Sequence, residues 1–207
     1  TEQLFNPAPQ AIYLVNASAQ TPDELPAASE QWQALKGDTL NLGYIQSPVW
    51  LAWQVQRGSD LPAPWYLVMH YPMLDRIEVF IRETGSAEFS RHLILGDHLR
   101  FAERPLRHPE FIVPFRLDSA APHEIFLKVS SSGALQVPLS LTSPEYFWQQ
   151  DRIMTLLEGG SYFICLIMAL YNFMLFLFLR DKSYLYYVLY IVFFVAALGT
   201  NRGWSFQ

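Results

Sequence analysis

The sequence predicts an all-β domain with a jelly-roll or β-sandwich fold, followed by an α-helical transmembrane hairpin. Three observations support this fold class. All 14 prolines lie between Pro7 and Pro144, short β-branched and aromatic runs recur up to residue 143, and two long uncharged runs occupy the remainder. With 51% hydrophobic and only 16% charged residues, the 207-residue chain is too apolar to be disordered.

The β domain is expected over residues 1–143. Alternation is clearest in the run 76–83, where Ile77, Val79 and Ile81 share one face and the other face is mostly charged. This pattern is typical of a half-buried antiparallel strand. Turn-forming segments rich in Gly, Pro, Ser and Asp separate the runs, as they do between the strands of a β-sandwich. We expect strands at residues 11–15, 39–45, 49–56, 65–71, 76–83, 89–95, 111–117, 124–130 and 135–142.

A connecting helix is expected over residues 144–158. Ser143, Pro144 and Glu145 have the order of an N-cap, a proline in the first helical position and an acidic first turn. If the helix continues into the uncharged run that follows, it forms a stiff link between the β domain and the bilayer.

Two uncharged runs predict transmembrane helices over residues 159–179 and 183–203. The first run has 21 residues, and at 1.5 Å per residue it reaches about 30 Å, the thickness of a bilayer's hydrocarbon core. The alternative, a buried hairpin of a soluble protein, is disfavoured because neither run has a polar face. The short loop between the runs carries Arg180 and Lys182, which favours a cytoplasmic loop and an extracytoplasmic β domain.

Charge and motif content exclude several classes of function. The net charge of −5 argues against binding to nucleic acid, whose phosphates need a basic face. Because Cys165 is the only cysteine, no intramolecular disulfide can form. There is no G-x-S-x-G elbow, phosphate-binding glycine loop or zinc spacing, so we expect no enzymatic activity, cofactor or metal site in this chain. A calcium site that uses Asp60, Asp75 or Asp97 is an alternative, although the sequence contains no Asp-rich loop pattern typical of calcium sites.

The order of six segments along the chain indicates a resemblance to a known protein family. They are SPVWL at 47–51, YPMLDRIEVFI at 71–81, the Gly-Asp pair at 96–97, RFAERPLRHPEFIVPFRL at 100–117, IFLKVSSSGALQVPLSLTSPEYF at 125–147 and ALYNFMLFLFLRDKSYLYYVLY at 169–190. In this order the chain resembles the bacterial seven-transmembrane receptors with diverse intracellular signalling modules (7TMR-DISM), specifically their second type of extracellular domain and first two transmembrane helices.

The resemblance implies a periplasmic jelly-roll sensor domain, similar in fold to carbohydrate-binding modules, attached to the bacterial inner membrane. In such receptors a seven-helix membrane domain leads to a cytoplasmic output module, such as a histidine kinase or a diguanylate cyclase. Five of the seven spans and any output module are absent here, so we expect the chain to be a fragment of a longer receptor.

We expect the β domain to bind a small, carbohydrate-like ligand, because aromatic faces stack on sugar rings and polar side chains bind hydroxyl groups. Strand alternation sends Trp50 and Trp53 to opposite faces, so part of the aromatic set must be core, and Trp50 is expected in packing. The candidate ligand-binding residues are Trp53, Trp65, Tyr66, Tyr71, Arg76, Asp97 and Arg104.

Two alternatives stay open at this point. Asp75-Arg76 and Arg104-Pro105 are also compatible with an internal ion pair that joins two turns. The domain as a whole is also compatible with a membrane-anchored protein–protein interaction or dimerisation module, for example in a homodimer, without any small-molecule ligand.

Overall fold

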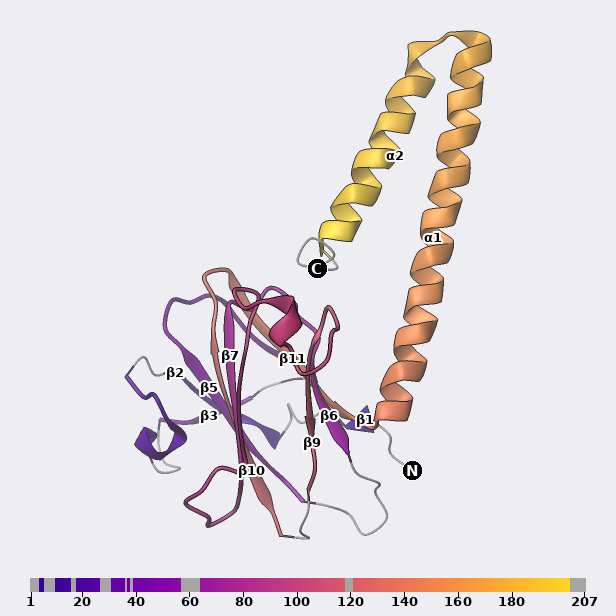
Figure 1. Ribbon diagram of the computed structural model, residues 1–207. Helices are drawn as coiled ribbons and strands as arrows, with labels where there is room; N and C mark the ends of the chain where they lie inside the picture. Colours follow the sequence, from indigo (N-terminus) through magenta and orange to yellow (C-terminus); the bar gives the residue numbers. More distant parts are fainter. Residues whose placement is uncertain are drawn as a thin grey trace. The chain divides into compact units, whose positions relative to one another are not determined.

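The computed structural model describes residues 4–5, 10–15, 18–26, 31–35, 37, 39–56, 64–117 and 121–201. The chain divides into two compact units, Thr1–Tyr146 and Phe147–Gln207, which are described separately. The first unit is a β-sandwich and the second contains two long helices (Figure 1). The predicted fold class is confirmed.

Two antiparallel sheets form the sandwich. The six-stranded sheet has the order β3 (Gln33–Ala34), β2 (Ile12–Val15), β5 (Val49–Val55), β10 (His123–Ser130), β7 (Arg76–Glu83) and β8 (Arg91–Leu95). The five-stranded sheet has the order β1 (Leu4–Phe5), β11 (Ala134–Thr142), β6 (Trp65–Met69) and β9 (Phe111–Phe115), and β4 (Thr39–Tyr44) also pairs with β11. Within the described parts of the chain, the connections contain the short 3-10 helices η2 (Pro22–Glu24) and η3 (Phe101–Glu103).

The main core lies between the sheets and is built by the expected alternation. Ile77, Val79 and Ile81 of β7 are all buried in it, which confirms the strand pattern expected for residues 76–83. In β5, Trp53 faces the main core while Trp50 faces the other side of the sheet, as alternation predicts.

A second, smaller cluster covers the outer face of the six-stranded sheet. Trp50 is fully buried there and stacks on Phe80 with ring centroids 5.8 Å apart. Arg82 donates hydrogen bonds to Glu124 (2.8 Å) and to Asp23 of η2 (2.7 Å), and so ties the connection that contains η2 onto this face. Much of the aromatic surface of this sheet is therefore covered by the chain itself.

The second unit consists of α1 (Pro144–Leu179) and α2 (Lys182–Asn201). The hydroxyl of Ser143 accepts a hydrogen bond from the backbone N–H of Tyr146 at 3.3 Å, which confirms the predicted N-cap. At 1.5 Å per residue, the 36 residues of α1 extend for about 54 Å, so the connecting segment and the first expected span form one helix.

Both helices are long and apolar enough to cross a membrane. The most apolar 18-residue stretch of each helix is almost entirely unburied within the protein. A soluble hairpin core would bury this surface, so the exposed apolar sides fit a lipid environment. The last two residues of the expected second span, 202–203, lie outside the described residues.

Candidate functional site

Three connections meet at one end of the sandwich. In the strand register, Arg76 at the start of β7 lies opposite Ser130 at the end of β10, and Ile77 lies opposite Leu95 at the end of β8. The connections at residues 70–75, 96–110 and 131–133 therefore leave the sheets together (Figure 1). We call this region the loop end.

Hydrogen bonds from backbone N–H groups join these connections to one another. The N–H of Asp97 donates to the carbonyl of Leu74 at 3.0 Å, and the N–H of Ser132 donates to Oδ2 of Asp75 at 2.7 Å. Gly96 packs against the backbone of Asp75, where no side chain would fit. Segments far apart in the sequence are thus held in a defined geometry.

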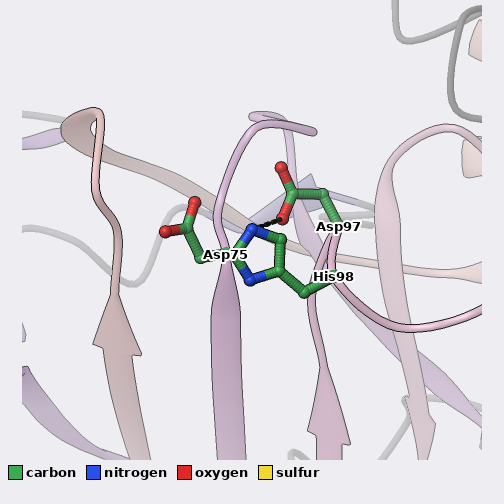
Figure 2. Close-up of side chains that lie close together, drawn as sticks. All are labelled: Asp75, Asp97 and His98. Carbon is green, nitrogen blue, oxygen red and sulfur yellow. Dashed lines mark ion pairs between the residues drawn. The ribbon is translucent and has the colours of Figure 1, made fainter.

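Asp75, Asp97 and His98 form a polar cluster at the loop end (Figure 2). One ligand atom from each lies within 4.8 Å of the others, and Nε2 of His98 is 3.8 Å from Oδ1 of Asp97. The Asp97 side chain is only 14% exposed, and its Oδ1 is buried without a hydrogen-bond partner among the described residues. A buried oxygen of this kind is costly unless a donor or a cation reaches it.

The cluster is also a candidate for holding a divalent cation. Carboxylate oxygens suit Ca²⁺ and Mg²⁺, and imidazole suits transition metals. Three protein donors would leave the remaining coordination positions to water or to oxygen atoms of a ligand. Asp75 and Asp97 belong to the calcium alternative drawn from the sequence, whereas Asp60 lies outside the described residues.

Arg104 braces the connection between β8 and β9. It is 9% exposed, and its Nη1 donates to the carbonyls of His108 (2.8 Å) and Pro109 (2.9 Å). Its guanidinium lies over the ring of Phe111, 4.5 Å from the centroid. Burial lowers the pKa of Arg104, and the nearby carboxylate of Asp97 opposes this shift by favouring the charged form. These contacts give Arg104 a structural role beside the cluster.

Tyr44 adds an exposed aromatic ring at the same end. It is paired with Ala134, two residues after Ser132, and 86% of its surface is exposed. The register of β4 and β11 shifts at this point, and Gly43 adopts a φ of 63°, a left-handed conformation that glycine tolerates. Such a bulge redirects the next side chain. Tyr44 is not among the residues predicted from the sequence, where the available signal was a glycine inside a strand pattern.

The other residues predicted from the sequence fall in different places. Tyr71 is half-buried at the loop end, and Arg76 is exposed at the start of β7, where it pairs with Glu78 at 3.0 Å. Trp53 and Trp65 are buried in the main core, so neither ring is open to a ligand in this structure. Tyr66 is half-buried near the start of β6, at the opposite end of the sandwich.

Comparison with known families assigns both parts of the chain. Residues 11–143 match the family described as 7TMR-DISM extracellular 2, and residues 154–207 match the family described as 7TM diverse intracellular signalling. The chain belongs to the 7TMR-DISM receptors. The predicted resemblance is therefore confirmed, and the sandwich is the extracellular domain of a membrane sensor family.

Solved structures similar to this 7TMR-DISM chain are distant from it. TmCBM61 in complex with β-1,4-galactotriose is 12% identical, with a TM-score of 0.32, over 62% of this chain and 86% of that one. The xylan-binding module CBM15 is 14% identical, with a TM-score of 0.36, over 68% of this chain and 95% of that one. No protein with curated annotation matches the chain.

Proposed function

We propose that this chain is the ligand-sensing part of a bacterial inner-membrane receptor, with its β domain in the periplasm. The extracellular family match precedes the membrane family match, and α1 begins directly after β11. In this proposal, a change at the β domain passes along α1 into the membrane domain. Any catalytic output belongs to a cytoplasmic module outside this chain.

The observation that carries the ligand proposal is the buried Oδ1 of Asp97, which accepts no hydrogen bond from the described residues and lies at the same end of the sandwich as exposed Tyr44. A sugar ring offers an apolar face for stacking and hydroxyl groups that donate to carboxylates. Asp75 and His98 supply further hydrogen-bonding groups in the cluster. We therefore propose that a small carbohydrate-like ligand binds at the loop end.

A binding experiment on the full chain tests this proposal. The 207-residue chain is placed in nanodiscs and titrated calorimetrically with neutral mono- and oligosaccharides. We expect saturable binding that weakens about tenfold or more in Asp97→Asn, which cannot offer the charged acceptor, and severalfold in Tyr44→Ala. Glu88→Gln, which removes an exposed carboxylate beyond the other end of β7, is the matched control and is expected to bind normally.

If none of the sugars binds while the β domain is demonstrably folded, the carbohydrate ligand is rejected. Crosslinking between β domains of the full-length receptor would then favour the dimerisation alternative. Equal binding by the wild-type chain and both site variants would reject the loop end as the binding site.

The topology is tested separately by protease access in spheroplasts. The basic residues Arg180 and Lys182 lie between the two helices and favour a cytoplasmic turn. External protease is expected to cleave the β domain of intact spheroplasts. Protection of the β domain until lysis would contradict the periplasmic assignment.

A further inference from the structure

A pocket of about 370 Å³ lies at the opposite end of the sandwich from the polar cluster. Residues from β8 and β9, the edge strands of the two sheets, line it together with neighbouring positions. Arg91 stands at the start of β8 and Phe115 at the end of β9, whereas the loop end adjoins the other ends of these strands. The pocket shares no residue with the polar cluster.

Arg91 occupies a strand position that alternation assigns to the core. It lies on the same side of β8 as Leu93, which packs against the main core, and Leu95, which is buried in it. The Nε of Arg91 is buried and has no hydrogen-bond partner among the described residues. A buried guanidinium N–H needs an acceptor, and none of the described residues that line the pocket carries a carboxylate.

Arg116 is a second arginine that lines the pocket. The hydroxyl of Ser90, also in the wall, already donates to the carbonyl of Ile81 at 2.9 Å, so among the described lining residues the guanidinium groups are the remaining side-chain donors. Arginine stays charged at every physiological pH, and its planar fork matches the oxygens of carboxylates and phosphates. Ile81 and Phe115 supply an apolar wall for the rest of a small ligand.

We propose that this pocket binds a small anionic ligand through Arg91 and Arg116, by a carboxylate or a phosphate group. Arg91 and Arg116 line one cavity in a chain whose net charge is −5, and the buried Nε of Arg91 has no acceptor among the described residues. The proposal does not depend on the carbohydrate site at the loop end. It adds a second recognition site to the same domain.

Three probes test this proposal on the full chain in nanodiscs of zwitterionic phosphatidylcholine. D-galacturonate and D-galactose share the sugar ring and differ at C6, where the first carries a carboxylate, and inorganic phosphate is used alone. We expect galacturonate or phosphate to bind saturably and at least tenfold more tightly than galactose. Binding of galacturonate alone identifies a carboxylate ligand, and binding of phosphate alone identifies a phosphate ligand.

Variants then locate the binding. Arg91→Gln and Arg116→Gln are each expected to weaken anion binding about tenfold or more, while the exposed Arg107→Gln leaves it unchanged. Arg91→Lys keeps the charge but loses the fork, so an intermediate loss is expected. Because Arg116 is exposed, its variant remains informative if the Arg91 variants fail to fold. Absence of binding by both anions, or equal binding by wild type and Arg116→Gln, would overturn the proposal.

The carbohydrate proposal for the loop end and the anion proposal for the pocket can be rejected separately. Asp97→Asn is expected to leave anion binding at Arg91 unchanged, because Arg91 is the first residue of β8 whereas Asp97 follows the opposite end of that strand. Anion binding that is lost in Asp97→Asn but kept in Arg91→Gln would transfer the anion to the loop end and overturn the pocket assignment.

Discussion

Gly96 lies directly against Asp75, so closely that a β-carbon on Gly96 would overlap the carbonyl oxygen of Asp75. One residue further on, the N–H of Asp97 donates to the carbonyl of Leu74 at 3.0 Å. This backbone contact sets the carboxylate of Asp97 beside that of Asp75. The geometry of the polar cluster thus depends on a position that has no side chain.

Substitution of Gly96 by alanine is expected to destabilise the β domain by about 2 kcal/mol, because the backbone must shift to relieve the overlap. Amide hydrogen exchange in β5 and β10 of the full chain measures this free energy of opening. Gly133→Ala is the matched control, because its β-carbon would lie 3.6 Å from Oγ of Ser131, an ordinary contact. Equal stabilities of the two variants would contradict the close approach at Gly96.

Arg104→Lys is expected to cost about 1–3 kcal/mol, because lysine keeps the charge but cannot reproduce the paired donation to the carbonyls of His108 and Pro109. The same hydrogen-exchange measurement reports the loss, and the exposed Arg107→Lys is expected to change stability by less than about 0.5 kcal/mol. A variant of Arg104 with normal stability but no ligand binding would instead make Arg104 a ligand-contacting residue.

Arg82 and Glu124 are expected to be coupled by about 1 kcal/mol, since both side chains are only about one-fifth exposed and lie 2.8 Å apart. Burial lowers the pKa of Arg82, but the hydrogen bonds to Glu124 and Asp23 outweigh it and raise the pKa overall. A double-mutant cycle with Arg82→Met and Glu124→Gln measures the coupling. The corresponding cycle with Asp23→Asn is expected to give a smaller value because Asp23 is 57% exposed. A larger coupling energy for Arg82 with Asp23 than for Arg82 with Glu124 would contradict this expectation.

Asp181 caps the start of α2, and its carboxylate accepts a hydrogen bond from the N–H of Ser183 at 2.9 Å. This bond holds the pKa of Asp181 below its ordinary value of 3.8. Because the folded pKa is depressed, the cap contributes stability above the ordinary pKa and loses it as the pH falls through the lowered one. Carboxyl ¹³C NMR of the full chain is expected to show a midpoint below 3.8 for Asp181.

Ser183→Pro is the control for this titration, because proline has no N–H to donate and is tolerated in the first turn of a helix. In that variant the pKa of Asp181 is expected to return toward its ordinary value. A wild-type midpoint at or above the ordinary value would contradict the capping interaction.

Features that depend on neighbours along the chain could be predicted from the sequence. The alternation of Ile77, Val79 and Ile81 identifies a strand and its buried face, and Ser143 with Pro144 marks the start of a helix. The motif order was sufficient to predict the family. For Trp50 and Trp53, alternation placed the rings on opposite faces, but it could not show that the outer face is covered as well.

The candidate site depends on contacts that local patterns do not contain. Asp75 and Asp97 belong to different connections and meet because β7 pairs with β8, which places Ile77 opposite Leu95. Tyr44 is exposed at the same end because a register shift redirects the last residues of β4. No spacing in the sequence specifies either arrangement.

The sequence alone therefore determined the two-part organisation, the main strands, the helix start and the family, because hydrophobic period and capping chemistry act over a few neighbouring residues. Tertiary structure alone decided that Trp65 is core, that Asp97 meets Asp75, and that Arg91 lines a pocket with an Nε that has no hydrogen-bond partner among the described residues. The physical reason is that sheet order and register arise from pairing between distant strands, and this pairing decides which side chains share a cavity.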